Sequence, residues 1–144
     1  MSVRYHTDDC TYRLPAKRLT AAWLADVARA EGYELGEVNY IFCSARKLLD
    51  MNRQFLGHDY FTDVITFDYG DRRRTRVVAG DIFIDVETVA DNARLYGATR
   101  LEEMRRVIVH GVLHLCGQKD KTPAANRQMH RKEDKYLDFW QPKR

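Results

Sequence analysis

The sequence predicts a single α+β domain in which about four strands form a small mixed sheet packed with about five helices. Its 144 residues suffice for one domain with a sizeable core. Two helical patterns with a strand between them come first, then two hairpin-like strands and three more helices. Neither an internal repeat nor a linker divides the chain, so residues 1–144 are expected to form one domain.

Composition is that of an ordinary globular protein, with 44% hydrophobic and 31% charged residues. The net charge of +3 permits a nucleic-acid partner without indicating one. The three cysteines, Cys10, Cys43 and Cys116, are far apart and form no CxxC pair, which favours a reducing cytosol over a disulfide framework. The first residues lack the apolar core of a signal peptide, and the run 107–117 is too short for a bilayer. We therefore expect a cytoplasmic protein.

The first half of the chain predicts two helices around one strand. Apolar residues at helical spacing predict an amphipathic helix over 16–31, and β-branched and aromatic residues predict a strand over about 37–43. Residues 44–57 are predicted to form a helix with a serine cap and a terminal glycine. The apolar residues of the first helix are Leu19, Trp23, Val27 and Ala30, and the end signals of the second are Ser44 and Gly57.

The second half predicts a strand pair followed by three helices. Alternating residues indicate strands over 62–69 and 81–86, joined by a basic loop. Helices are predicted over 85–97 and 101–117, each ended by a glycine, and over 122–140. The terminal glycines are Gly97 and Gly117, and the start signals of the last helix are Thr122 and Pro123.

The stretch VIVHGVLHLCGQKD, residues 107–120, is the most apolar in the chain but contains two histidines four apart. Residues at this spacing lie on one face of a helix, so His110 and His114 can bind one ion. Gly117 ends the helix, and the turn can return Asp120 as a third ligand. Two nitrogens and one oxygen leave an open position on zinc, which is typical of a catalytic site.

The two histidines can instead be hydrogen-bonded core residues, and His130 is a rival third ligand. His6 and His58 are too remote in sequence to place. Metalloproteases with an HExxH helix carry a glutamate base where this chain has Gly111, which argues against proteolysis. Phosphodiester chemistry demands less of the protein, because a metal can neutralise charge on phosphate and activate hydroxide.

Three blocks occur in an order that is specific to one family. HGVLHLCG with its downstream acid is similar to HGxLHLxGyDH, MNRQFLGHDYFTDVITFDY to LNxxyRxxdxpTDVLSFpy, and AGDIFIDVETVADNA to lGDIxIsxexvxxqA. These are motifs of the YbeY family, bacterial zinc-dependent endoribonucleases also called rRNA maturation factors. The chain resembles this family over about residues 37–137; the first helix and an N-terminal strand are less diagnostic.

The resemblance implies a single-domain α+β fold with one zinc ion beside a groove and cleavage of single-stranded RNA. It also implies roles in maturing the 16S rRNA 3′ end and in ribosome quality control. The partners it implies are the small ribosomal subunit, ribosomal protein S11 and the GTPase Era.

The resemblance places His110 and His114 on the first two metal ligands. Asp120 falls on the family's last histidine, and a carboxylate oxygen is a competent zinc ligand. A second alignment frame puts Lys121 at that position, where an ammonium group cannot bind zinc. We prefer the first frame, which predicts a site made of two histidines and one aspartate.

The family's arginine, which is thought to bind or polarise the RNA phosphate, falls on Leu56. Arg53, one helical turn earlier, and Lys119 are the residues that we predict to contact phosphate instead. The alternative for both is a solvated surface charge.

Four further residues in or near the matched blocks have less specific roles. Thr62, Asp63 and Thr66 match TDVLS and are expected to fix the strand's entry or to face the groove, with a structural role favoured for Asp63. Asp81 either orients a zinc-bound histidine or closes a turn. Cys116 is expected to point away from the metal into the core.

An RNA substrate would need a positive surface, and a dense group of arginines lies between the two hairpin strands. Tyr69, nearby, could stack on an unpaired base, although such a run is more often a solvated loop. The arginines are Arg72, Arg73, Arg74 and Arg76.

The sequence therefore predicts a zinc-dependent endoribonuclease with one zinc ion per chain. Two rival hypotheses remain. A ribosome assembly factor with a structural zinc and little catalysis is favoured by Leu56, and another metal-dependent hydrolase, such as a peptidase, is opposed by Gly111.

Overall fold

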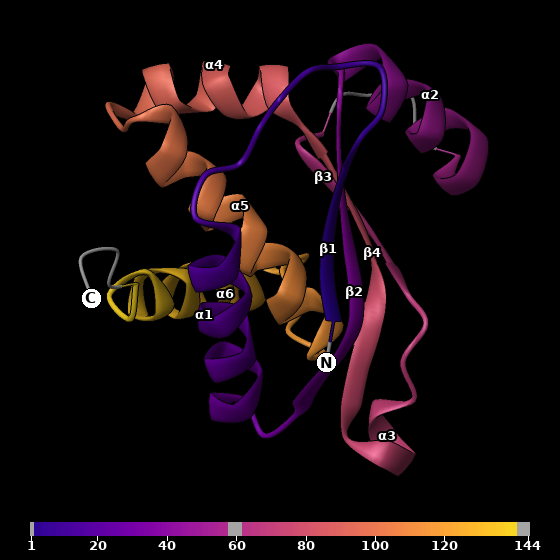
Figure 1. Cartoon of the computed structure of the whole chain (residues 1–144), viewed down its shortest axis with the longest axis vertical. Helices are drawn as coiled ribbons and strands as arrows, with labels where there is room; N and C mark the ends of the chain where they lie inside the picture. The colour runs from indigo at the N-terminus through magenta and orange to yellow at the C-terminus, as the bar shows by residue number, and fades with distance from the viewer. Residues whose placement is uncertain (1, 58–61, 141–144) are drawn as a thin grey trace.

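The computed structural model describes residues 2–57 and 62–140 (Figure 1). Four strands and six helices occur within these two ranges, against the four strands and about five helices expected. In chain order they are β1 (Ser2–Thr7), α1 (Lys17–Ala30), β2 (Glu34–Cys43), α2 (Ala45–Leu56), β3 (Val64–Asp68), α3 (Arg72–Thr75), β4 (Val77–Asp85), α4 (Val86–Tyr96), α5 (Arg100–Leu115) and α6 (Pro123–Leu137).

The sheet is mixed, as the sequence predicts, with the strand order β1-β2-β4-β3. The pairs β1–β2 and β2–β4 are parallel, and β3 pairs with β4 in the antiparallel sense. The expected hairpin is therefore confirmed, but β4 starts at Val77, four residues before the predicted strand. The basic loop between its strands contains the one-turn helix α3.

Helices cover both faces of the sheet. In Figure 1, α1, α5 and α6 lie on one side, whereas α2 lies on the other side near the end of β3 and β4. The larger core forms on the first side and the smaller one beneath α2, where Ile65 packs with Leu48 and Met51. Sheet residues of the larger core are Leu35, Val38, Tyr40, Phe42, Val78, Ile82 and Ile84.

The predicted ends of α2 and the predicted start of α6 are confirmed, whereas α6 ends at Leu137, three residues before the predicted end. Ser44 Oγ accepts a hydrogen bond from Lys47 N–H at the start of α2, and Thr122 Oγ1 accepts one from Ala125 N–H at the start of α6. Gly57 ends α2 in the left-handed conformation, with φ of 68°. Within the described ranges, none of the helices has the length and apolar character to cross a membrane.

The buried face of α1 differs from the one predicted. Trp23 and Val27 are buried as expected, but Leu19 is 39% exposed and Ala30 is also exposed. The helix instead buries Thr20, Leu24, Ala25 and Ala28. The stripe differs because α1 packs against both β2 and α5, and Trp23 Nε1–H also donates a 2.7 Å hydrogen bond to Tyr136 O of α6.

Two of the three cysteines lie in the core, and Cys10 is partly buried. Cys43 and Cys116 are buried, and all three cysteines are free thiols. Burial raises the pKa of the Cys116 thiol to about 12. The expected core role of Cys116 is therefore confirmed.

Candidate metal centre

Helix α5 lies against the sheet along one face and exposes its two histidines along another. Gly111 is at the contact: a Cβ at this position would lie 2.8 Å from Ile82 Cγ2, closer than real contacts allow. The residue after the first histidine therefore faces β4, and a glutamate there would point at the sheet and would force Ile82 to shift. His110 and His114, with side chains 18% and 25% exposed, lie away from this contact.

The end of α5 returns the chain toward these histidines. Gly117 has φ of 94°, which glycine adopts without steric cost. Its N–H donates to His114 O and the next N–H, of Gln118, donates to Leu113 O, both at 2.9 Å. This pair of bonds is a Schellman motif, and it directs Asp120 back toward the helix.

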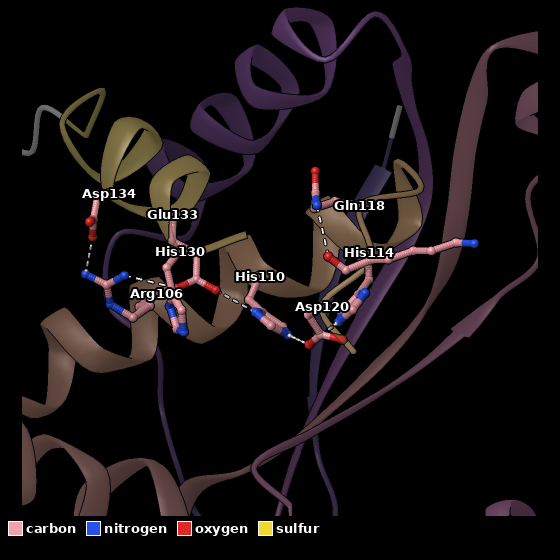
Figure 2. Close-up of polar contacts among 9 residues, drawn as sticks. Arg106, His110, His114, Gln118, Asp120, His130, Glu133 and Asp134 are labelled. Carbon is pink, nitrogen blue, oxygen red and sulfur yellow. Dashed lines mark hydrogen bonds and ion pairs between the residues drawn. The ribbon is translucent and has the colours of Figure 1, made fainter. Parts of the chain in front are cut away.

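The returned carboxylate meets both imidazoles (Figure 2). Asp120 Oδ2 lies 3.2 Å from His114 Nε2 and 3.5 Å from His110 Nε2, and all three atoms lie within 4.8 Å of one another. Zinc–ligand bonds of about 2.0–2.2 Å in a tetrahedron put neighbouring ligand atoms about 3.3 Å apart. The donor set suits a zinc ion, and the two distances to Asp120 match this spacing.

Glu133 of α6 orients the first of these histidines (Figure 2). His110 Nδ1 lies 2.6 Å from Glu133 Oε2, in a carboxylate that is 2% exposed. The Nδ1–H donates to this oxygen, so Nε2 keeps its lone pair and points it toward Asp120. Arg106 Nη1–H donates to the other oxygen, Oε1, at 3.0 Å, and His130 Nδ1 lies 3.2 Å from it.

Glu133 and His110 each shift the pKa of the other. Burial alone would raise the pKa of Glu133, but the hydrogen bonds and charges of His110 and Arg106 hold it below its usual range. Burial alone would lower the pKa of His110, but Glu133, with Asp63 and Asp120, raises it above the ordinary value. A basic imidazole is a strong metal ligand once its proton has left.

The pKa of His114 is lowered, in contrast to that of His110. Burial and the neighbouring His110 lower its pKa, outweighing the opposing effects of Asp120 and a hydrogen bond with the backbone of Gln118. The His114 imidazole is therefore neutral at neutral pH, the form that binds metal.

Two cavities open beside this centre and share Asp63 and His110. One, of about 430 Å³, extends toward α4 and α6; the other, of about 450 Å³, contains the metal-binding group. Thr62, Asp63 and Thr66 all line the second cavity, so the expectation that they face a groove is confirmed. A bound metal would be accessible from two directions.

Known proteins match this chain over nearly its whole length. A sequence model of the family described as Endoribonuclease YbeY matches residues 4–141. The chain belongs to the endoribonuclease YbeY family. The relative from Bacteroides thetaiotaomicron, named Endoribonuclease YbeY, is 47% identical over 139 residues, covering 95% of this chain and 98% of that protein.

Further relatives agree with this membership of the YbeY family. A protein of the same name from Cytophaga hutchinsonii is 44% identical over 138 residues, 96% of this chain and 95% of the relative. The solution structure of TM1509 from Thermotoga maritima is 26% identical, covers 95% of this chain and 87% of that one, and superposes with a TM-score of 0.63. The predicted family and α+β fold are thus confirmed.

The metal ligands predicted from the YbeY signature come together, and the rival does not join them. Among the described residues, His110, His114 and Asp120 are the group whose donor atoms converge. The side chain of His130 is 58% exposed, and its Nδ1 faces Glu133. His58 lies outside the described residues.

Neither of the two predicted phosphate contacts is among the described residues that line the cavities beside this centre. Arg53 on α2 is exposed, with Nη1 3.9 Å from Asp50 Oδ1. Lys119 is exposed in the turn after α5, whereas Lys121 lines the cavity of about 450 Å³. Leu56 is the last residue of α2, and its side chain lies outside the described part of the chain.

Asp81 does not orient a metal-binding histidine. Its carboxylate accepts hydrogen bonds from Asn39 Nδ2 at 3.0 Å and Tyr69 Oη at 2.9 Å. That expectation is wrong because Asp81 lies inside β4, where its nearest polar groups come from neighbouring strand residues. Glu133 has the role instead.

The arginines of the basic loop mostly have partners within the protein. Arg72 pairs with Asp68 at 2.7 Å. The guanidinium of Arg76 lies over the Tyr33 ring and donates a hydrogen bond to the carbonyl oxygen of Gly32, in the turn between α1 and β2. Arg74 lies 3.8 Å from Asp71. Arg72 and Arg76 are therefore engaged within the fold, and Arg74 is 85% exposed, as expected for a solvated loop.

Sequence reasoning missed Glu133, although a signal was present. Met129, Glu133 and Tyr136 are spaced four and three apart on α6, and all three are buried. A glutamate in the apolar stripe of a helix needs a buried partner. That partner could have been sought among the histidines.

Proposed function

We propose that this chain is a zinc-dependent endoribonuclease that cleaves single-stranded RNA, acting in 16S rRNA 3′-end maturation and ribosome quality control. The observation that carries the proposal is the convergence of two imidazole nitrogens and one carboxylate oxygen beside an open cavity, in a chain of the YbeY family. Zinc suits this donor set, and its two nitrogens and one oxygen would leave a position for substrate.

We assign the residues of the site three separate roles: metal binding, orientation of a ligand and contact with phosphate. His110, His114 and Asp120 would hold the ion, and bound zinc would supply Lewis-acid chemistry that offsets charge on a phosphodiester. Glu133 keeps the His110 ring in one orientation and tautomer. Arg53 or Lys119 would contact the RNA phosphate. The reacting phosphodiester would lie where the two cavities meet, near His110.

The peptidase alternative loses support from the packing of α5. The position of the usual glutamate base is occupied by Gly111, where a Cβ would lie 2.8 Å from Ile82 Cγ2, so a side chain there would point at β4 and would force Ile82 to shift. Phosphodiester cleavage does not require a base at that position.

We also propose that the protein works in the cytoplasm with the small ribosomal subunit, ribosomal protein S11 and the GTPase Era. The family membership supports these partners. Pull-down of the small subunit by the tagged protein, with His114→Ala as a folded variant lacking the metal ligand, separates binding from cleavage.

The test of the activity is cleavage of a single-stranded RNA by zinc-loaded protein. We expect chelation to abolish cleavage, zinc to restore it, and His114→Ala to lose it while circular dichroism shows a folded chain. His130→Ala is the matched control, because His130 lies beside the centre but outside the ligand group. A 2′,3′-cyclic phosphate product would identify the RNA 2′-OH as nucleophile, and a 5′-phosphate would identify water. Equal cleavage by wild type and His114→Ala would refute the proposal.

The phosphate contacts need a separate comparison. Arg53→Ala or Lys119→Ala should lower kcat/KM by about 10- to 100-fold, the range for a hydrogen bond to a charged group. Arg46→Ala, an exposed arginine on the same helix as Arg53, is the control. If both variants match this control, neither residue binds phosphate.

A further inference from the structure

One buried carboxylate is not used by the metal centre. Glu103 on α5 is 6% exposed and lies near the charges of Arg106 and His130, but its carboxylate makes no hydrogen bond with any residue in the ranges 2–57 and 62–140, and its oxygens keep contact with solvent at a cavity. A charged group so placed is costly unless something satisfies it. Its carboxylate borders the cavity of about 430 Å³, so a ligand in that cavity could do so.

This cavity, which we call the α4–α5 pocket, is lined in part by Asn92, Tyr96, Glu103, Arg106 and His110. Its volume lies in the range of small-molecule sites and suffices for one nucleotide. It shares His110 with the metal centre, so a ligand here would be adjacent to a phosphodiester held there.

The polar groups of the α4–α5 pocket disfavour a phosphate as its occupant. Glu103, Asp63 and Glu133 all contribute carboxylates, whereas the guanidinium of Arg106 is already bonded to Glu133 and Asp134 at 3.0 and 2.7 Å. An anion would meet like charge that no free guanidinium offsets. The occupant should instead be neutral and rich in N–H donors.

A second metal ion is also disfavoured. Among the described residues, the donor atoms that converge within 4.8 Å are those of His110, His114 and Asp120, and Glu103 is not in that group. The carboxylate of Glu103 therefore lacks the neighbouring ligands that a divalent ion requires.

A nucleobase meets these requirements. Proteins recognise unpaired bases by stacking them on aromatic rings and bonding their Watson–Crick edges. Tyr96 supplies a ring that is 67% exposed at the pocket, and Glu103 supplies two acceptor oxygens. Guanine offers two adjacent donors, N1–H and the 2-amino group, whereas uracil offers one donor between two carbonyl oxygens that a carboxylate repels.

We propose that the α4–α5 pocket binds an unpaired guanine of the RNA next to the cleaved bond, with Glu103 accepting from its Watson–Crick edge and Tyr96 stacking on it. The inference rests on the proposed function, because it makes Glu103 the residue that sets base preference in cleavage. Asn92, on α4 beside Tyr96, adds an amide to the same pocket.

The first experiment is cleavage of a single-stranded RNA pool with one randomised region, followed by sequencing of the product ends. Wild type should favour guanine over uracil about 10- to 100-fold at one fixed position, because guanine gives two donors to the Glu103 carboxylate whereas uracil gives one donor between two repelling carbonyl oxygens. Glu103→Gln presents one acceptor and one donor, so the preference should move to adenine. Asp91→Asn removes an exposed carboxylate of α4 that does not line the pocket, and it should keep the guanine preference.

The second experiment measures binding without cleavage. Guanosine and uridine, which have no phosphate, are titrated into zinc-loaded protein and followed by NMR. Guanosine should bind at least tenfold more tightly than uridine in wild type and Asp91→Asn, but not in Glu103→Gln. Tyr96→Leu should weaken guanosine about tenfold, whereas Leu95→Ala, at the exposed neighbouring residue, should not.

The outcomes distinguish guanine binding in the α4–α5 pocket from the proposed nuclease activity. Selective guanosine binding without RNA cleavage would support the pocket and refute the nuclease proposal. RNA cleavage with no base preference, and equal binding of the two nucleosides, would overturn the pocket and leave the nuclease. Loss of a second bound metal in Glu103→Gln would also overturn it, because Glu103 would then be a metal ligand.

Discussion

Replacing Glu133 tests whether the buried carboxylate sets the metal affinity. The Glu133 side chain is 2% exposed and accepts from His110 Nδ1–H at 2.6 Å, so the hydrogen bond is charge-assisted and protected from water. Such bonds contribute about 1.5–3 kcal/mol, which corresponds to about 10- to 100-fold in zinc affinity, the range found for carboxylates behind metal-binding histidines. Glu133→Gln keeps an acceptor and should lose about tenfold. Glu133→Ala, which keeps none, should lose about 100-fold.

The neighbouring residue supplies the control. Asp134 accepts from the same Arg106 at 2.7 Å, but its side chain is 68% exposed. A surface ion pair of this kind contributes less than about 1 kcal/mol, and Asp134 does not bond to His110. Asp134→Asn should therefore keep the wild-type zinc affinity within about twofold.

The assay is competition for zinc against a chromophoric chelator at fixed pH, with thermal unfolding to check that each variant is folded. Equal affinities for Glu133→Gln and Asp134→Asn would refute the argument that the 2.6 Å hydrogen bond tunes the centre.

Three further predictions concern α5 and the turn that follows it. Asp120→Ala should lose most bound zinc by metal analysis, while Lys121→Ala should retain it; full occupancy in the first variant would exclude the aspartate as a ligand. Gly111→Val should lower the free energy of unfolding by about 1–3 kcal/mol in urea titrations, because its side chain would collide with Ile82; an unchanged midpoint would contradict this packing. Zinc affinity should fall as the pH falls through the raised pKa of His110, because a proton then competes for the ring; constant affinity from about pH 8 to about pH 5.5 would refute it.

The parts of the fold that the sequence predicted are those with strong local signals. Ser44 and Thr122 cap helices through bonds within three residues, and Gly57 ends one by its own backbone conformation. The residue pattern did not place β1, an edge strand with mostly half-exposed residues. Its position depends on parallel pairing with β2, from Ser2 with Glu37 to Thr7 with Phe42, and a local pattern does not record such pairing.

The metal ligands were predictable because they lie on one helix and the turn that follows it. His110 and His114 share a helical face, and the glycine turn that returns Asp120 has a recognisable sequence. Glu133 was missed because it comes from α6, and its approach to His110 depends on how α6 packs against α5. Long-range packing of this kind cannot be read from spacing alone.

The burial of Glu103 also could not be predicted from local sequence. In sequence it is one of two glutamates at the start of α5, beside Glu102, whose role in the capping box is a local pattern. Only the packing of α4 and α6 around α5 buries Glu103 and leaves its carboxylate at a cavity.

The most direct test of the metal centre is a crystal structure of the zinc-loaded protein with anomalous diffraction measured at the zinc edge. The centre predicts one strong peak within about 2.0–2.2 Å of His110 Nε2, His114 Nε2 and an Asp120 carboxylate oxygen. It also predicts that the hydrogen bond from His110 Nδ1 to Glu133 persists when the metal is bound. A peak at His130 and Glu133 instead, or the absence of a peak near Asp120, would contradict the assignment of this site as the centre at which RNA is cleaved.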